Sequence, residues 1–435
     1  MGLGKTVQAL TMLRHYKEQN GSLKAMVICP TTLIYNWENE IKKFTPDLTY
    51  RIHHGSIRTR NVDELEQSNI IITTYGTLRS DIMVLSKTTF DYVILDESQA
   101  IKNPGSKVAK AACLLTAKNR LCMSGTPLQN NTFDIFAQMN FLNPGLLGSM
   151  EFFRNEFANP IDKFGEPEQK DHLRKLLHPF ILRRTKEQVA KDLPEKMETI
   201  LFCEMEDAQR NVYEAYRNAY RDKILGVIDD QGIDRSQLTI LQGLMKLRQI
   251  CDSPAILNEE EKYPNNSIKL EELTREITEN IGEHKALIFS QFLGMLALIK
   301  EKLKENNVPF EYFDGSTSPQ DRQKAIENFQ NNDECRVFLI SLKAGGVGLN
   351  LTAADYVYIV DPWWNPAVEQ QAIDRTHRIG QTKNIFAYRM ICKDTIEDKI
   401  LQLQDRKRIL AKELIADDTS FVKSLSKEDV EYLFS

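Results

Sequence analysis

The feature that most constrains this chain is a series of short, continuous apolar runs separated by stretches of helical periodicity. In the N-terminal part the runs are Met26–Cys29, Asn69–Thr73, Tyr92–Glu97 and Arg120–Pro127. Such runs are typical of parallel strands that helices cover on both faces. The functional loops of such a sheet lie at the carboxyl ends of its strands, where two acids and a Ser-Gly-Thr-Pro turn fall. The sequence therefore predicts an α/β fold.

A second set of runs lies at Lys285–Ser290, Phe310–Phe313, Arg336–Ser341, Tyr356–Val360 and Ile385–Met390. Between the two sets the sequence is mostly helical and charged, with apolar stripes of its own. We expect a first lobe over residues 1–132, helical insertions and an interlobe linker over 133–282, and a second lobe over 283–393. A helix and tail should follow over 394–435, beginning at the capping pattern Asp394-x-x-Glu397.

The composition is that of an ordinary globular protein, with 42% hydrophobic and 27% charged residues among 435. No apolar run is long enough to span a bilayer. The seven cysteines are scattered without a C-x-x-C pair, which argues against zinc and a disulfide framework and fits a reducing cytosol. The net charge of −5 disfavours nucleic-acid binding, but a local basic stripe is sufficient for phosphate contact. Residues 172–191 are such a stripe, and a solvated helix face explains them equally well.

The chain opens with MGLGKT, which matches the end of a phosphate-binding loop. In such a loop Gly2 and Gly4 let the backbone approach a nucleotide, Lys5 contacts the β- and γ-phosphates, and the Thr6 hydroxyl binds Mg²⁺. The full pattern needs a residue before Met1 and is incomplete here. Short turns of this composition also occur by chance, so the motif needs support from elsewhere in the chain.

That support comes from YVILDES, a hydrophobic strand that ends in two acids. Enzymes with a phosphate-binding loop present a Mg²⁺ ligand and a water-activating acid in this way. Asp96 would then bind Mg²⁺, and Glu97 would orient and deprotonate the attacking water. The alternative is an acidic first turn of a helix. Because both motifs occur in order in the same half, the sequence favours ATP hydrolysis.

QQAIDRTHRIGQ contains Arg375 and Arg378, which would share a face if the segment is helical. Two guanidinium groups on one face suit a triphosphate, because arginine makes planar bidentate contacts and stays charged. Surface ion pairs with Glu369 and Asp374 are the alternative. The second lobe has no GKT of its own, which favours arginines that complete the ATP site of the first lobe.

A glycine-rich loop and two tryptophans precede that segment. Gly346 and Gly348 in SLKAGGVGLNLT allow close backbone approach to phosphates of ATP or of nucleic acid, although a tight turn explains them as well. Trp364 lies between prolines in DPWWNP and either contacts a nucleic-acid strand or packs between the lobes. Trp37 belongs to a helical stripe and is expected in the core.

Polar residues at other strand ends suit a phosphate backbone, which hydroxyl and backbone N–H groups bind without reading bases. The candidates are Pro30, Thr31, Thr73, Ser290 and Gln291. Each of them taken alone is equally explained as a helix cap or turn residue.

Together these motifs resemble the SWI/SNF-like family of DNA-translocating ATPases, within helicase superfamily two. The resemblance covers nearly the whole chain, and SGTPLQN, AGGVGLNLT and DRTHRIGQ are its most specific parts. The other segments that carry it are MGLGKT, CPTTLIYNW, ITTYGTL, LDESQAIKN, ALIFSQF, YFDGSTSPQDR and DPWWNPAVEQQ.

The resemblance implies an α/β fold of two RecA-like parallel-sheet lobes with inserted helical protrusions and a C-terminal brace helix. It implies ATP and Mg²⁺ as cofactors and movement along one strand of duplex DNA. Lys5, Thr6, Asp96 and Glu97 match the family's ATP and Mg²⁺ positions, and Arg375 and Arg378 match its arginine fingers. Gln371 matches the leading glutamine of its motif, and Ser124 and Thr126 match the motif that couples ATP to DNA.

The sequence departs from the family pattern in two places. Gln99 stands where the family commonly has histidine, so coupling that depends on histidine is in question. The family's strand and adenine-reading glutamine upstream of the phosphate loop are absent, which suggests a truncated product or a misassigned start. A longer reading frame before Met1 would support that hypothesis, and a native protein that begins at Met1 would refute it.

The function that the sequence favours is a DNA-dependent ATPase motor that translocates on double-stranded DNA and remodels protein–DNA complexes. RNA polymerase or another DNA-bound protein is a candidate partner, and a bacterial, cytoplasmic, nucleoid-associated location is expected. A strand-separating helicase is one alternative. A catalytically weak remnant that binds DNA or RNA polymerase is another, because the nucleotide site is incomplete.

Overall fold

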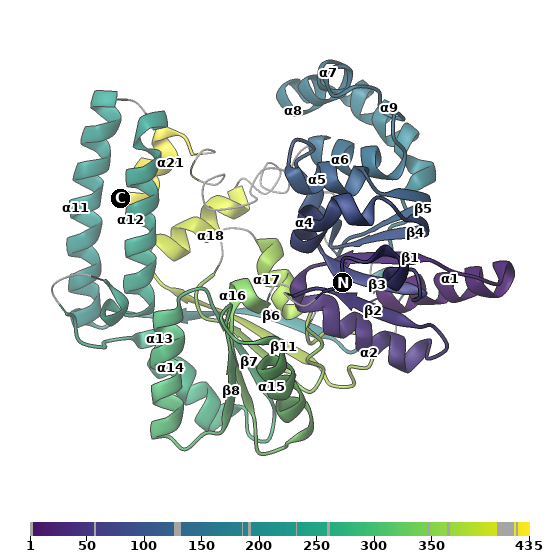
Figure 1. Ribbon diagram of the computed structural model, residues 1–435. Helices are drawn as coiled ribbons and strands as arrows, with labels where there is room; N and C mark the ends of the chain where they lie inside the picture. The colour runs from purple at the N-terminus through teal and green to yellow at the C-terminus, as the bar shows by residue number, and fades with distance from the viewer. Residues whose placement is uncertain are drawn as a thin grey trace. The chain divides into compact units, whose positions relative to one another are not determined.

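The computed structural model describes residues 3–55, 58–125, 132–184, 186–189, 193–231, 233–258, 262–345, 349–362, 366–406, 422 and 425–435 (Figure 1). The chain forms two compact units, Met1–Lys191 and Asp192–Ser435. Each unit is built on its own parallel sheet, as predicted. Among the helices that the structure describes, none has the length and apolar character of a membrane span.

The sheet of the first unit has the strand order β2-β3-β1-β4-β5, and every pairing is parallel. Its strands are β1 (Ala25–Cys29), β2 (Tyr50–His53), β3 (Ile70–Thr74), β4 (Thr89–Asp96) and β5 (Thr116–Met123). Its larger helices are α1 (Lys5–Asn20), α2 (Ile34–Phe44), α4 (Tyr75–Leu85), α5 (Lys107–Cys113) and α6 (Thr132–Leu142). All residues of β1 and β3 are buried, as expected for strands with both faces covered.

A small helical cluster extends from the first unit. It contains α7 (Met150–Phe153), α8 (Asn159–Phe164) and α9 (Pro167–Leu177), and a short helix α10 (Lys186–Val189) follows. Phe153 is fully buried in this cluster, where it packs against Phe133, Phe136 and Phe157. The cluster therefore has an apolar core of its own.

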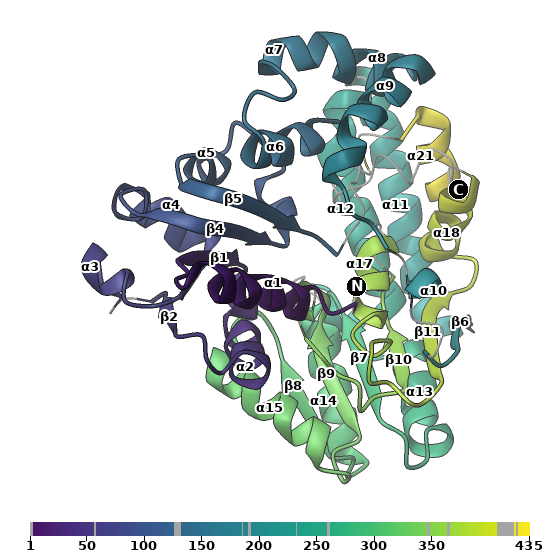
Figure 2. The same ribbon diagram turned by 90° about the vertical axis from the view of Figure 1, so that its right-hand side faces the viewer.

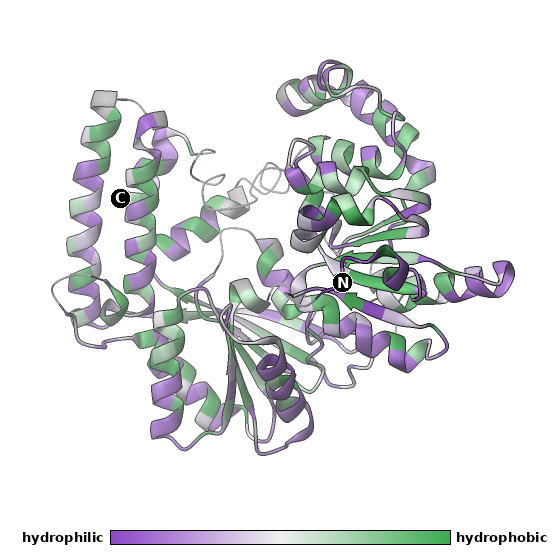
Figure 3. Cartoon of the chain, viewed as in Figure 1, coloured by the Kyte–Doolittle hydropathy of each residue, from purple (hydrophilic) through white to green (hydrophobic). Residues whose placement is uncertain are grey.

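The sheet of the second unit has the strand order β6-β11-β10-β7-β9-β8, again with parallel pairings. Its strands are β6 (Lys196–Cys203), β7 (Ala286–Ser290), β8 (Phe310–Phe313), β9 (Val337–Ser341), β10 (Tyr356–Ile359) and β11 (Ile385–Cys392). Its helices near the sheet are α13 (Ile268–Arg275), α14 (Leu293–Glu305), α15 (Pro319–Asn331), α16 (Leu342–Gly345) and α17 (Pro366–Ile373). Figure 3 shows largely hydrophobic strands and a largely hydrophilic α15.

Two long helices, α11 (Asp207–Gln231) and α12 (Ile233–Asp252), lie side by side in the second unit (Figure 1). The sequence predicts an apolar stripe on α12, in which Leu244, Leu247 and Ile250 are fully inaccessible and Leu241 and Met245 are partly buried. The C-terminal helices α18 (Ile396–Arg406) and α21 (Lys427–Phe434) lie beside this pair (Figure 2). The start of α18 differs from the prediction, because Thr395, not Asp394, accepts the hydrogen bond from the Glu397 N–H.

All apolar runs predicted as strands form strands, but β2 and β6 were not predicted. The segment expected to contain helical insertions and an interlobe linker, residues 133–282, is divided between the units. Helices α6 to α9 belong to the first unit, whereas β6 and α11 to α13 belong to the second. Strand β6 pairs with β11 from Lys196 to Cys203, so the second sheet includes residues far ahead of the expected lobe start at 283.

Candidate active site

The GKT segment spans the beginning of α1. Gly4 precedes the helix with φ 71° and ψ 31°, a left-handed conformation that glycine adopts without strain. Lys5 and Thr6 are the first two residues of α1, and both are partly exposed. The backbone N–H groups and positive dipole end of a helix favour an anion at this position.

Asp96 is the last residue of β4, and the residue is 5% exposed. Its Oδ2 accepts a hydrogen bond from Trp37 Nε1 at 3.0 Å, and its Oδ1 accepts one from the Glu97 N–H at 3.0 Å. The Tyr75 hydroxyl donates to the Asp96 backbone carbonyl at 2.8 Å. Side chains from α2 and α4 therefore fix the orientation of this acid.

Burial is the largest cause that raises the pKa of Asp96, and the nearby charge of Glu97 adds to it. The Trp37 hydrogen bond and the positive charge of Lys5 act in the opposite direction. The effect of Lys5 on Asp96 means that the end of β4 and the beginning of α1 lie close together. The predicted phosphate-loop lysine and the predicted Mg²⁺ acid are therefore within electrostatic range of each other.

Glu97 has φ 51° and ψ 55°, a left-handed conformation that is uncommon for a residue with a side chain. Its Oε2 accepts a hydrogen bond from Gln99 Nε2 at 2.8 Å. Gln99 Oε1 in turn accepts one from the Ser124 hydroxyl at 3.2 Å. Gln99 thus connects the acid after β4 to the serine after β5 without a histidine.

The oxygen-rich end of β4 fits a magnesium ion by its chemistry. Each carboxylate oxygen of Asp96 carries one hydrogen bond in the structure and has a further lone pair for a cation. Carboxylate and hydroxyl oxygens are ligands that Mg²⁺ accepts, together with water and phosphate. Asp96 and Thr6 are therefore suitable ligands.

Arg375 and Arg378 belong to the second unit, and the prediction that they share a helix face is wrong. Helix α17 ends at Ile373, and both arginines lie in the turns that follow. The Arg375 side chain is 1% exposed, whereas Arg378 is partly exposed and donates from Nε to the Asp374 carbonyl at 3.0 Å. Gln371 lies on α17 and is partly exposed.

Two predicted nucleic-acid contacts are wrong, because the side chains concerned are buried. The Thr73 side chain is inaccessible, and its hydroxyl donates to the His53 carbonyl at 2.8 Å. Ser290 is also inaccessible, and its Oγ accepts from the Phe292 N–H at 3.1 Å. Both hydroxyls stabilise the ends of their strands instead. Thr31 is exposed, and Pro30 and Gln291 are partly exposed, so these three can face a ligand.

Gly2, Thr126, Gly346, Gly348 and Trp364 lie outside the described residues. Sequence reasoning missed the contact between Trp37 and Asp96, although it correctly placed Trp37 in the core. The helical stripe of Trp37 carried no signal for the hydrogen bond, because the pairing joins α2 to β4 through the tertiary fold.

Comparison with known families finds a match for both parts of the chain. The sequence profile of the SNF2-related domain matches residues 1–256, and that of the helicase conserved C-terminal domain matches residues 268–380. A Mycoplasma pneumoniae protein called an uncharacterized ATP-dependent helicase is 37% identical over all of this chain, which spans 41% of its length. YwqA of Bacillus subtilis, whose name includes the words helicase and translocase, is 37% identical, and the chain spans 48% of it. The chain thus covers less than half of these relatives.

A more distant relative is the TATA-binding protein-associated factor MOT1 of Saccharomyces cerevisiae, 33% identical over the whole chain and 27% of its own length. Among solved structures, the Sulfolobus solfataricus SWI2/SNF2 ATPase core in complex with dsDNA is 38% identical. That alignment covers 100% of this chain and 91% of that chain, with a TM-score of 0.48. Because the SNF2-related profile matches more than half of the sequence, this chain belongs to the SNF2 family.

Proposed function

We propose that this chain is a DNA-dependent ATPase that hydrolyses ATP to translocate on double-stranded DNA and to remodel protein–DNA complexes. The observation that supports this most directly is the adjacent pair of acids at the end of β4, next to the positive charge of Lys5. Bacterial relatives whose names include the words ATP-dependent helicase are consistent with it.

In this proposal, the N-terminus of α1 binds the phosphates of ATP, with Lys5 adding positive charge. Asp96 and Thr6 hold Mg²⁺, which when bound neutralises charge on the phosphates. Glu97 orients the attacking water and accepts its proton. The Gln99 hydrogen bond holds the Glu97 carboxylate in one orientation, as a positioned base requires.

Arg375 and Arg378, from the second unit, supply positive charge to the phosphates in the transition state. Their contribution depends on closure of the two units around ATP, which makes hydrolysis a conformational cycle. Gln371 is proposed as a further contact to the nucleotide from α17. We also propose that the backbone comes close to phosphate groups at four glycines, which are Gly2, Gly4, Gly346 and Gly348.

DNA contact is proposed at the carboxyl ends of strands, through Pro30, Thr31 and Gln291. Contacts of this type bind the phosphate backbone and carry little sequence preference. Ser124 and Gln99 connect the β5 end to Glu97, and this route supports coupling between DNA and hydrolysis. A DNA-bound protein such as RNA polymerase is the proposed target, in a cytoplasmic setting.

The test is ATP turnover of the full chain with and without duplex DNA, in Mg²⁺. Duplex should stimulate turnover, Glu97→Gln should abolish it, and Lys5→Ala should do the same while DNA binding persists. DNA binding without turnover in the unmodified chain would favour the remnant alternative and overturn the proposal. Release of a labelled strand from a duplex would favour the strand-separating helicase, whereas displacement of a third strand without duplex separation supports translocation.

A further inference from the structure

Lys269 has a fully buried ammonium group in the second unit. Its Nζ donates to Asp252 Oδ1 at 3.0 Å, to Glu397 Oε1 at 2.6 Å and to the Val360 carbonyl at 2.8 Å. These acceptors belong to the last residue of α12, the first turn of α18 and the residue that follows β10. The three ammonium hydrogens thus have three partners, and one side chain of α13 joins three separate elements. We call Lys269, Asp252 and Glu397 the buried triad.

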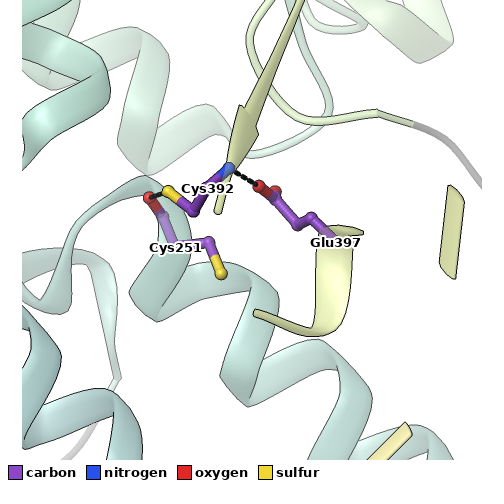
Figure 4. A group of neighbouring side chains, drawn as sticks. All are labelled: Cys251, Cys392 and Glu397. Carbon is purple, nitrogen blue, oxygen red and sulfur yellow. Dashed lines mark hydrogen bonds between the residues drawn. The ribbon is translucent and has the colours of Figure 1, made fainter. Parts of the chain in front are cut away.

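A metal site is the first alternative for this region. Among the described residues, Cys251, Cys392 and Glu397 bring their ligand atoms within 4.8 Å of one another (Figure 4). However, Glu397 accepts from Lys269 through Oε1 and from the Cys392 N–H through Oε2 at 3.0 Å. The Cys392 thiol donates to the Cys251 carbonyl at 3.3 Å. Burial raises the pKa of this thiol well above its usual value, so it stays protonated, and the ammonium of Lys269 is the cation of the region.

Burial acts to lower the pKa of Lys269, but the charges of Asp252 and Glu397 outweigh it and raise this pKa well above the usual value. The Lys269 ammonium is therefore charged at neutral pH, whereas burial raises the pKa of its partner Asp252 well above the usual value. A buried ion pair of this kind adds little net stability over apolar packing, because desolvation offsets the attraction. Removing one partner is costly, which favours a single arrangement of the elements that carry the charges.

A second buried cation contacts the same stretch of backbone. Arg248 on α12 is 1% exposed and donates from Nη2 to the Pro362 carbonyl. Lys269 and Arg248 thus hold the carbonyls on either side of Asp361. The inaccessible Asp361 carboxylate accepts from the Gln291 N–H at 2.9 Å. The position of Gln291 after β7 therefore depends on the segment 360–362, which the two cations fix.

We propose that Lys269 is a positioning residue: through the segment 360–362 it sets Gln291 for contact with the DNA phosphate backbone, and it ties this geometry to helix α18. The inference rests on the proposed function, since it assigns a role within the DNA-contacting side of the second unit. Its consequence is that disturbance of the triad weakens the response to DNA more than it weakens hydrolysis itself.

The test compares Lys269→Met with Lys285→Met in the full chain. Lys285 is a matched control, because it is 6% exposed and its Nζ donates to the carbonyls of Phe329 at 2.6 Å and Asn332 at 2.9 Å. It precedes β7 and so lies at the opposite end of the strand from Gln291. The isosteric Glu397→Gln is a milder variant that serves if Lys269→Met does not fold.

Turnover without DNA, maximal turnover with duplex DNA and the half-saturating DNA concentration are measured below the melting temperature of every variant. For Lys269→Met we expect about a tenfold rise in half-saturating DNA, or an equal loss of stimulation, with DNA-free turnover within about twofold of wild type. Glu397→Gln should change the half-saturating DNA concentration or the stimulation in the same direction. Lys285→Met should keep the stimulation of turnover by DNA. Loss of stimulation in both lysine variants in proportion to their melting temperatures would overturn the inference, because the role would then be purely structural.

Amide hydrogen exchange separates this inference from the proposed function. Lys269→Met should raise exchange in peptides covering residues 286–293 and 356–362, and Lys285→Met should leave both unchanged. If wild type shows no response to DNA, the proposed function fails, and faster exchange confined to Lys269→Met still supports the positioning of the loops. Unchanged exchange in Lys269→Met overturns it.

Discussion

Gln99 donates a hydrogen bond from Nε2 to Glu97 Oε2 at 2.8 Å while its Oε1 accepts one from Ser124 at 3.2 Å. An amide donates and accepts at the same time and carries no charge at any working pH. A histidine in this position would gain a proton near pH 6.5. The residue that connects the β4 and β5 ends in this chain therefore does not titrate.

The first prediction concerns this amide. Gln99→Leu keeps the size of the side chain but removes both hydrogen bonds, so we expect DNA-stimulated turnover to fall about tenfold or more because Glu97 loses its fixed orientation. Gln99→Glu should be at least as damaging, since a second carboxylate repels Glu97. Single-turnover ATP hydrolysis measures the effect. Turnover in Gln99→Leu equal to wild type would show that the connection is not used.

The second prediction concerns Trp37. Trp37→Phe removes the donor to Asp96 Oδ2, and since this bond favours the ionised acid, the pKa of Asp96 should rise further. The acid limb of the pH profile of ATP turnover should then move to higher pH, with a stability loss of about 1–3 kcal/mol. Tyr75→Phe is the control, because the Tyr75 hydroxyl donates to the backbone carbonyl of Asp96 and not to its carboxylate. It should lower stability and leave the acid limb in place.

The third prediction is that Arg375 and Arg378 contribute differently to turnover and to stability. Arg378→Ala should lower DNA-stimulated turnover by about 10³-fold or more, as for arginine fingers elsewhere, with little change in melting temperature. Arg375→Ala should lower turnover and melting temperature together, because Arg375 is 1% exposed and its loss leaves a buried gap. Melting curves and turnover on the same samples test this. Equal stability losses for both variants would contradict the expected difference.

The packing of the C-terminal helix is tested at two glycines. A Cβ at Gly243 on α12 would lie 2.9 Å from the Tyr220 ring and 3.0 Å from the Phe434 ring, so Gly243→Ala should cost about 1–3 kcal/mol by forcing α21 outward. Gly226 on α11 has open space around its Cβ position, and Gly226→Ala should stabilise by about 0.5–1 kcal/mol. Protease cleavage within residues 422–435 should increase only in Gly243→Ala.

Asp361 predicts a pH dependence of stability. Burial raises its pKa from 3.8 to about 6, against the opposing charges of Arg248 and Lys269 and the hydrogen bonds from Ser290 and Gln291. The folded chain therefore binds a proton that the unfolded chain releases, and stability is lost as pH rises from about 4 to about 6. In Asp361→Asn the side chain at this position does not titrate. The melting temperature of the variant minus that of wild type should therefore increase as pH rises through this window and level off above it. A constant difference would show that Asp361 is ionised throughout.

The central strands were predictable because they are buried on both faces. β1, β3, β7 and β9 are continuous apolar runs in the sequence and are entirely buried. The two strands that were missed, β2 and β6, are edge strands. β6 reads KMETILFC, and three consecutive residues at its beginning, Met197 to Thr199, are exposed. An edge strand needs no apolar run, so the rule that found the others does not apply to it.

The site was predictable at the level of motifs and not at the level of contacts. The acids of β4 and the start of α1 follow from local sequence, but the partners Trp37 and Gln99 become visible only in the folded chain. Arg375 and Arg378 were misplaced because their three-residue spacing suits a helix that ends at Ile373, and no glycine or proline marks that end. The hydroxyls of Thr73 and Ser290 were misassigned because the sequence does not show whether a strand-end hydroxyl faces solvent.

Glu97 has a left-handed backbone conformation, so replacing this residue with glycine should have an unusual consequence in a cell. A side chain held in this conformation costs about 1–2 kcal/mol relative to glycine, so Glu97→Gly should remove the proposed base and relax the backbone at the same time. Chaperones and proteases act on unfolded chains and would not remove such a product. It would accumulate as well as the active protein, compete for the same DNA and act as a dominant inhibitor in a cell that also carries the functional form.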